Sequence, residues 1–136
     1  MASTSDVDLN EVLDAETIAV VGCSATPGKA AHGVPKYMKD HGYRIIPVNP
    51  YADEVFGIEA YDSLDEVDEH IDIVDVFRPS DEAPGIVDQV LSRDDVDTVW
   101  LQLGIRHDEA GERVRESGRT FVQDKCLKVV HRRLRG

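Results

Sequence analysis

Apolar residues gather in five short runs along this chain, and segments with a helical spacing of apolar residues separate the runs. The first run, Thr17 to Gly22, is rich in β-branched residues and ends in glycine. Such a run is typical of a strand buried in a parallel sheet. The same reasoning predicts strands at 17–22, 43–50, 71–79, 96–104 and 119–124.

Helices are predicted between these strands. One should cover 31–41 and end at Gly42. Others are predicted at 7–15, 82–92, 108–117 and 125–134, with a short helix after Ser63; Ser63 and Ser80 are expected to act as caps. Strands that alternate with helices form a mainly parallel sheet with right-handed crossovers and helices on both faces. We therefore predict an α/β fold with a five-stranded sheet.

The organisation of the chain suggests one unit. Its 136 residues suit a single domain, and no repeat, linker or low-complexity segment divides them, so we expect one domain over 1–136 with about the first ten residues flexible. The longest irregular stretch runs from Tyr51 to Leu64. Because ligands of open α/β sheets bind beyond the carboxyl ends of the strands, the residues that end each strand are the candidates for a site.

The charge balance is strongly acidic. Asp and Glu total 27 against 15 Lys and Arg, a net charge of −12, which would repel a nucleic-acid backbone. An excess of surface carboxylates suits a high-salt cytoplasm, so we hypothesise a halophilic protein; an ordinary acidic protein is the alternative. The basic tail, Lys128 to Gly136, is interpreted as a helix end that complements its own dipole.

Two further features concern the compartment. No run approaches the roughly 18 consecutive apolar residues of a membrane span, and the amino terminus lacks the features of a signal peptide. Cys23 and Cys126 are too few for a disulfide framework and lack metal-type spacing. We expect a soluble, cytoplasmic protein with reduced thiols and no membrane partner.

The turn after the first strand reads GCSATPGK, from Gly22 to Lys29, and differs from a dinucleotide-binding turn. A dinucleotide fingerprint reads G-x-G-x-x-G and has an acidic residue about 20 positions further on. Here the next glycine is Gly28, and the second strand ends at Asn49. Backbone N–H groups around Ser24 to Thr26, the hydroxyls of these two residues and the Lys29 ammonium can still converge on a phosphate near a helix start. A tight turn with a solvated lysine is the alternative.

The other strand ends add candidates. Pro47 and Pro50 flank the end of the second strand and leave a stiff, partly apolar wall that suits an adenine face. The third strand ends in Phe77-Arg78-Pro79, and its arginine suits a phosphate. An ion pair between this arginine and an acidic neighbour is the alternative. Gln102 reaches the same edge and can hydrogen-bond a ligand, whereas Trp100 is expected in the core.

Together these motifs resemble the stand-alone CoA-binding proteins of the CoA_binding_2 type, which are similar to the CoA-binding domain of succinyl-CoA synthetase α subunits. The matching pieces follow the family order from about Glu11 onward: TIAVVGCSATPGK, YRIIPVNPYADEVFGIEAYDSL, DIVDVFRPS, VWLQLGI and QDKCLKVVH. The resemblance implies a Rossmann-like domain that holds coenzyme A across the strand ends. Residue by residue, it implies a CoA site formed by Gly22, Ser24, Lys29, Val48, Asn49, Pro50, Phe77, Arg78, Pro79 and, as a weaker member, Gln102.

Signals for catalysis are few. Cys126 and His131 are five residues apart, which on a helix is about 500° of rotation and leaves the side chains roughly 140° apart, so we expect no catalysis by this pair. Cys126 can still lie near the CoA thiol and form a mixed disulfide under oxidation. The histidines lack metal-ligand spacing, so we predict no metal site. Asp75 lies inside an apolar run and must find buried partners, and its role stays open.

Two functions from different classes follow. The first is a non-catalytic module that binds CoA or an acyl-CoA, with a separate acyl-CoA enzyme as a candidate partner. The second is an enzyme of the same fold that uses an NAD(P)-type nucleotide or acts on an acyl-CoA thioester. The missing acidic residue at Asn49 and the weak Cys126–His131 pair favour the first.

Overall fold

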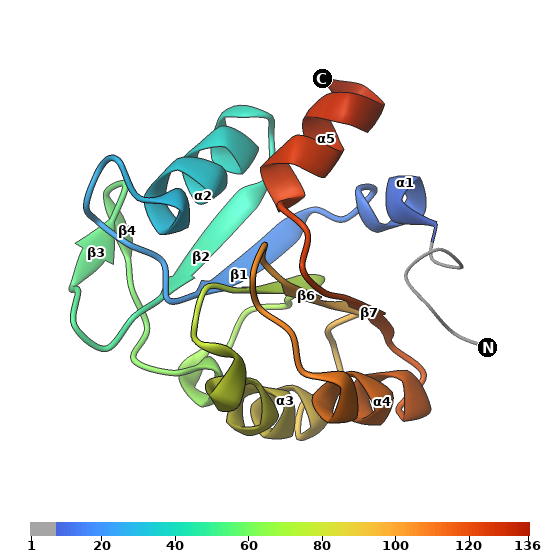
Figure 1. The fold of residues 1–136 in the computed structure, drawn as a ribbon. Helices are drawn as coiled ribbons and strands as arrows, with labels where there is room; N and C mark the ends of the chain where they lie inside the picture. The colour runs from blue at the N-terminus through green and yellow to red at the C-terminus, as the bar shows by residue number, and fades with distance from the viewer. Residues whose placement is uncertain (1–7) are drawn as a thin grey trace.

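A five-stranded sheet forms the middle layer of the fold (Figure 1). The computed structural model describes residues 8–136. The strands lie in the order β2-β1-β5-β6-β7, and all four neighbouring pairs are parallel. Their bounds are β1 (Thr17–Val21), β2 (Arg44–Val48), β5 (Ile73–Val76), β6 (Thr98–Leu101) and β7 (Thr120–Val122). The predicted fold class is therefore confirmed, with each strand shorter than predicted because the chain turns soon after the last ladder bond.

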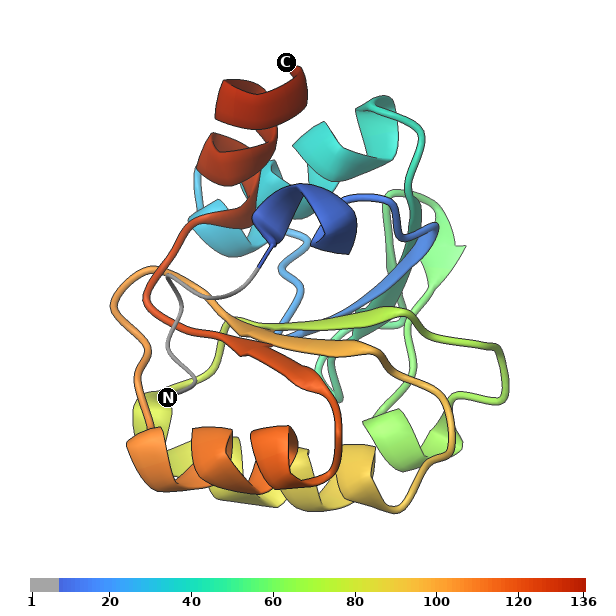
Figure 2. The ribbon, with the colours of Figure 1, turned by 90° about the vertical axis from the view of Figure 1, so that its right-hand side faces the viewer.

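Helices cover both faces of the sheet (Figure 2). On one face lie α3 (Ala83–Leu91) and α4 (Asp108–Glu116). The other face carries α1 (Leu9–Val12), α2 (Ala30–Asp40) and α5 (Leu127–Arg135). The chain enters at β1 in the interior of the sheet, moves outward to β2, and then crosses back to β5. The strand order thus reverses between β1 and β5, which is where open α/β sheets bind ligands.

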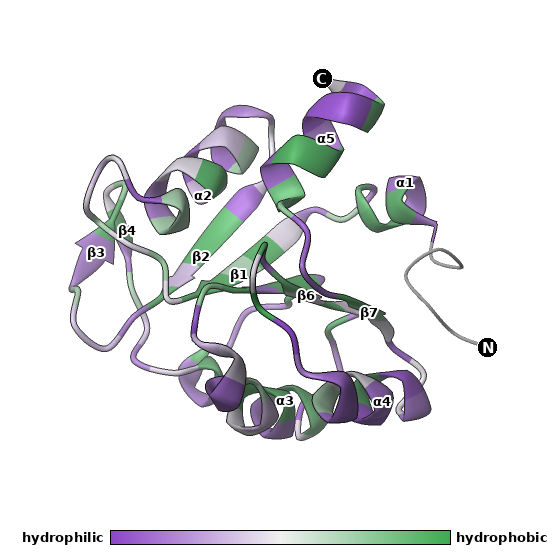
Figure 3. Cartoon of the chain, viewed as in Figure 1, coloured by the Kyte–Doolittle hydropathy of each residue, from purple (hydrophilic) through white to green (hydrophobic). Residues whose placement is uncertain are grey.

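Each face of the sheet has its own apolar core (Figure 3). Alternate residues of a strand point to opposite faces, so Ile73 packs under α2 and α5, whereas Val74 packs above α3 and α4. Trp100 is fully buried in the core that contains Ile73, next to α2 and α5. Its Nε1 donates to the Lys125 carbonyl at 2.8 Å. The expectation that this tryptophan is a core residue is confirmed.

The irregular segment after β2 contains a hairpin that the sequence analysis did not predict. Strands β3 (Glu54–Val55) and β4 (Ile58–Glu59) pair in antiparallel fashion. They are joined by Phe56 and Gly57, whose φ angles are 57° and 74°. Two positive φ angles in a two-residue loop are the signature of a type I′ turn, and strands this short carry too few residues to show alternation.

Neither predicted serine cap makes a side-chain cap bond, although Ser63 does occupy the N-cap position of the short helix predicted after it. Ser63 precedes only a short 3₁₀ turn, Leu64–Glu66, and makes no side-chain cap bond. The Ser80 hydroxyl instead accepts from the N–H of Arg106 at 3.0 Å, while the chain enters α3 through a second 3₁₀ turn, Ser80–Glu82. The Ser80 hydroxyl, which was expected to cap α3, therefore bonds to the loop at Arg106 instead.

The predicted amino-terminal helix is present only over Leu9–Val12, with Asp8 as its cap through a 3.1 Å bond to Glu11 N. Residues 9 and 10, which we expected to be flexible, belong to this helix. Residues 1–7 of that expectation lie outside the described range. Every helix between residues 8 and 136 is too short or too polar to span a bilayer.

Candidate ligand-binding cleft

A cleft of about 530 Å³ opens at the carboxyl ends of β1, β2 and β5. Its walls are the turn after β1, the loop after β2, the end of β5 and one side of α3. Of the ten residues that the sequence analysis assigned to a site, eight line this cleft: Gly22, Ser24, Lys29, Val48, Asn49, Pro50, Phe77 and Arg78. Three strand ends far apart in the sequence thus meet around one space.

Gly22 lets the Arg78 side chain lie across the turn. Its φ is +88°, a conformation that residues with a Cβ rarely adopt. A Cβ at this position would sit 2.9 Å from Cδ of Arg78 and 3.2 Å from the carbonyl oxygen of Phe77. The glycine therefore serves the approach of β5's end to the turn after β1.

The amino end of α2 faces the cleft without a cap. Lys29 occupies the N-cap position and makes no side-chain cap bond, and both Lys29 and Ala31 line the cleft. The Ser24 hydroxyl accepts from Thr26 N at 3.0 Å and keeps its own proton free to donate. Uncapped N–H groups at a helix start, a hydroxyl and an ammonium are suited to an anion such as phosphate.

Asn49 joins the two loops that form one side of the cleft. Its Nδ2 donates to the Cys23 carbonyl at 2.9 Å, and its Oδ1 accepts from Tyr51 N at 2.8 Å. The Gly22 N–H adds a 2.8 Å bond to the Val48 carbonyl. An aspartate at position 49 could not donate to a carbonyl, which gives a structural reason for the asparagine where a dinucleotide fold has an acid.

Arg78 forms the ion pair that the sequence analysis left open as an alternative. Its Nε and Nη2 donate to the two carboxylate oxygens of Glu82 at 3.1 and 2.8 Å. Hydrogen bonding to Glu82 raises the pKa of Arg78, and the guanidinium lowers the pKa of Glu82 in return. Both side chains are nearly half exposed, so the pair lies at the cleft wall and remains accessible to a ligand.

Pro79 and Gln102 lie outside the cleft lining. Gln102 is only 3% exposed, and its Oε1 accepts from Leu127 N at 3.0 Å, so it fixes the start of α5. Residues that the sequence analysis missed take part instead. Tyr51 at the rim is 92% exposed, and Glu82, Ile86 and Gln89 come from one side of α3 and the turn before it. Their spacing of four and three residues is a helical signal that was available in the sequence.

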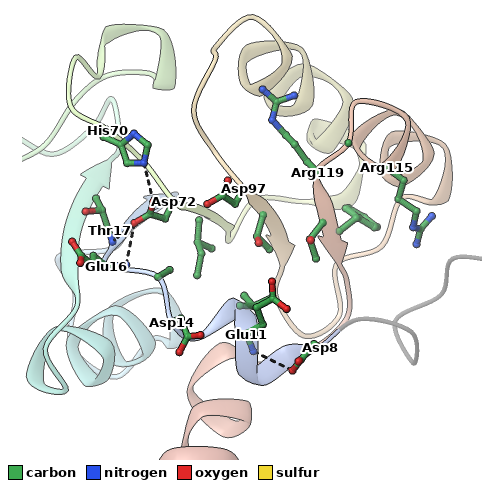
Figure 4. Close-up of a pocket in the computed structure, with 17 residues that line it drawn as sticks. Asp8, Glu11, Asp14, Glu16, Thr17, His70, Asp72, Asp97, Arg115 and Arg119 are labelled. Atoms are coloured by element: carbon green, nitrogen blue, oxygen red, sulfur yellow. Dashed lines mark hydrogen bonds and ion pairs between the residues drawn. The ribbon is translucent and has the colours of Figure 1, made fainter.

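A larger hollow of about 1210 Å³ lies at the opposite edge of the sheet, near the amino ends of the strands (Figure 4). The guanidinium of Arg119 is turned to the carbonyls of Arg93 and Val96, and that of Arg115 lies 5.2 Å from the Phe121 ring centre. Six carboxylates contribute to the lining: Asp8, Glu11, Asp14, Glu16, Asp72 and Asp97. Such a surface repels an anionic ligand, so the smaller cleft is the better phosphate site.

Cys126 and His131, the residues considered for catalysis, have separate contacts in the structure. His131 is buried, with Nδ1 2.9 Å from the Tyr37 hydroxyl, while Cys126 occupies the N-cap of α5. Burial and, to a lesser extent, the nearby Asp75 raise the pKa of Cys23 to about 12, which keeps this thiol protonated. Among residues 8–136, no group of three or more His, Cys, Asp or Glu side chains is arranged to hold a metal ion.

Comparison with known proteins assigns the family. The sequence profile of the CoA_binding_2 family, described as a CoA binding domain, matches residues 16–132. The chain belongs to this family. Its similarity to the uncharacterised protein YneT of Bacillus subtilis (strain 168) is 44% identity over 132 residues, which is 96% of this chain and 97% of YneT.

Part of a larger enzyme is also similar to this CoA binding domain. The ADP-forming acetate–CoA ligase of Methanocaldococcus jannaschii is 32% identical over 84 residues. The match takes in 62% of this chain but only 12% of the ligase. Most of the ligase therefore lies outside the region that it shares with this chain.

Solved structures share the fold of the CoA binding domain described above. The cell-free ID.343 protein of Thermus thermophilus has a TM-score of 0.87 at 42% identity and covers 94% of this chain and 99% of its own. A hypothetical protein of Pyrococcus horikoshii OT3 has a TM-score of 0.90 at 29% identity, with coverage of 100% and 98%. These structures support the Rossmann-like architecture over nearly the whole chain.

Proposed function

We propose that this protein binds coenzyme A, or an acyl-CoA, in the cleft at the carboxyl ends of β1, β2 and β5. The observation that carries the proposal is the placement of two cations, Lys29 and Arg78, beside an uncapped helix start in one cleft. Membership of the CoA binding domain family supports the same ligand. CoA carries several phosphate groups, an adenine and a pantetheine arm with apolar stretches, and the cleft offers partners for both the charged and the apolar parts.

The charged contacts divide between two sides of the cleft. Lys29, the Ser24 hydroxyl and the first N–H groups of α2 form one phosphate subsite, and Arg78 forms another. Between them, Val48, Pro50 and Phe77 provide the apolar wall for the adenine or the pantetheine arm. Asn49 acts mainly by holding the loops in place.

We infer a role in binding without catalysis. In the described part of the chain, the thiol of Cys23 is buried and protonated, and His131 is engaged by Tyr37 and separated from Cys126 by the helix geometry. An enzyme acting on an acyl-CoA thioester remains the second candidate. Thioester hydrolysis that disappears in Cys126→Ala would establish it.

The relatives suggest how such a module is used. In the acetate–CoA ligase the similar region is a small part of a larger protein, so we propose that this chain presents CoA to a separate acyl-CoA enzyme. The free, unpaired state of both cysteines suits a reducing cytoplasm, where such enzymes and free CoA would meet the protein.

Calorimetry on the purified protein tests the proposal with CoA, acetyl-CoA, 3′-dephospho-CoA and NAD. We expect CoA binding that Lys29→Ala and Arg78→Ala each weaken by about 1–3 kcal/mol, because each removes a charge-assisted hydrogen bond to phosphate. Lys36→Ala is the matched control, since Lys36 lies on α2 but pairs with Asp40 and does not line the cleft. Tight NAD binding without a CoA signal would overturn the choice of ligand, and unchanged affinity in both cleft variants would refute the site.

A further inference from the structure

Arg78 already has a partner in the free protein. Its Nε and one Nη2 hydrogen are directed at the two oxygens of Glu82, an arrangement that fills one whole edge of the guanidinium. A phosphate binds arginine through the same kind of two-bond contact. The Glu82 carboxylate therefore occupies the position at Arg78 that a ligand phosphate would take. It also supplies the negative charge that the phosphate would supply.

Displacement of Glu82 costs little. The pair is an i,i+4 contact with side chains 43% and 45% exposed, and pairs of this kind add only a small stabilisation. The Arg78 stem is held by a different feature, its close packing over Gly22, where even a Cβ would be too near. The position of the arginine over the cleft thus depends mainly on the glycine, while Glu82 mainly neutralises the guanidinium.

A phosphate at the other edge of Arg78 would meet the same opposition. Two anions would then share one guanidinium, and the carboxylate would repel the phosphate across it. Glu82 lowers the affinity for an anion in either geometry. Asp62 also lines the cleft but forms no ion pair among residues 8–136, so it contributes a negative charge of the same size without engaging Arg78.

We propose that Glu82 is an internal competitor for Arg78, which limits the affinity of the cleft for CoA and speeds its release by recapturing the guanidinium as the phosphate leaves. The inference rests on the proposed CoA site and adds a residue to it. A module that hands CoA to another protein needs such release, because a ligand held by every available charge would leave slowly.

The test compares CoA affinity and stopped-flow dissociation in wild type, Glu82→Gln, Asp62→Asn, Arg78→Ala and the Arg78→Ala/Glu82→Gln double variant. We expect Glu82→Gln to bind CoA about two- to fivefold more tightly, mostly through slower dissociation. Asp62→Asn should gain less, and the double variant should gain nothing over Arg78→Ala. Weaker binding by Glu82→Gln, an equal gain in Asp62→Asn, or the same gain without Arg78 would each overturn the proposal.

A second readout separates this inference from the CoA proposal. The Arg78 Nε–H resonance is followed by NMR while inorganic pyrophosphate is added to wild type and to Glu82→Gln. The variant should respond at a lower pyrophosphate concentration, because no carboxylate has to be displaced. If neither wild type nor Glu82→Gln binds CoA, the CoA proposal fails. Equal responses of the two proteins to pyrophosphate would refute the competition between Glu82 and phosphate for Arg78, whether or not CoA binds.

Discussion

Asp75 is a buried acidic residue whose hydrogen-bonding capacity is not satisfied. It lies in the middle of β5, is 1% exposed, and its Oδ1 has no hydrogen-bond partner among residues 8–136. In the sheet it is aligned with Val20 on one side and Trp100 on the other. Burial raises the pKa of this carboxyl well above its ordinary value, because the charged form loses its hydration. The folded protein therefore favours the protonated, neutral form of Asp75 more strongly than the unfolded chain does.

This leads to a pH dependence with a definite sign. An unfolded aspartate has a pKa near 3.9, so above about pH 4 the unfolded chain releases a proton that the folded chain keeps. The contribution of Asp75 to the free energy of unfolding should therefore fall as pH rises from 4 toward the folded pKa. In Asp75→Asn, which cannot ionise, that part of the decline should be absent. Urea unfolding of both proteins between pH 4 and 8 measures it, and parallel curves would contradict the assignment.

Residues also show where sequence reasoning stopped. Lys29, Asn49 and Arg78 were predictable as neighbours in one cleft because the carboxyl ends of parallel strands must meet at one edge of the sheet. The hydrogen bonds that both polar atoms of the Asn49 side chain form with neighbouring loops were not predicted, because bonds between loops distant in sequence leave no local pattern. The position of Gln102 at the sheet edge was likewise predicted, but its hydrogen bond from Leu127 N was not.

Among the elements, α2 and α5 share a contact built from aromatic and histidine rings. His131 on α5 bonds to Tyr37 on α2, and its ring lies 5.2 Å from that of His41 and 5.7 Å from that of Tyr43. Burial, followed by His41 and Arg135, lowers the pKa of His131. A proton on this ring would be placed near other cationic groups at the helix contact.

The α2–α5 contact should therefore weaken in mild acid. Because the folded pKa of His131 is depressed, its contribution to stability is present above the unfolded pKa of about 6.5 and is lost as pH falls below it. In His131→Gln, which still accepts from Tyr37 but cannot be protonated, the unfolding midpoint should depend less on pH between 7.5 and 5. His32→Gln, on α2 but outside the ring cluster, serves as control. A wild-type slope in His131→Gln would refute the role.

The elements themselves were largely readable from the sequence. The amphipathic segments α2 and α4 have strong helical periodicity, and the structure has them within one residue of their predicted bounds. The apolar run of β1 also ends within one residue of its prediction, whereas β5 covers only Ile73–Val76 of the predicted 71–79. The exceptions are the short ones. The hairpin of β3 and β4 and the two 3₁₀ turns each contain too few residues to show a period, and the loop around Arg106 decided what Ser80 would bond.

At the scale of the whole molecule, the surplus of negative charge is unevenly placed. Arg44, Arg93 and Arg113 each pair with a carboxylate, as do three other arginines, so most of the arginines are already matched. The unmatched carboxylates include several of the six that line the hollow at the amino edge of the sheet (Figure 4). At low salt these groups repel one another in the folded state more than in the expanded chain.

Salt should therefore stabilise this protein, as the halophile hypothesis requires. Screening acts over about 10 Å at 0.1 M salt but over about 3 Å at 1 M, so molar KCl removes most of the repulsion between exposed carboxylates. We expect the thermal midpoint to rise from low to molar KCl. Glu11→Gln/Glu16→Gln, which removes two charges from the acidic hollow, should gain stability at low salt and show a smaller rise. A midpoint that is equal at low and molar KCl would leave an ordinary acidic protein, because adaptation to high salt depends on this difference.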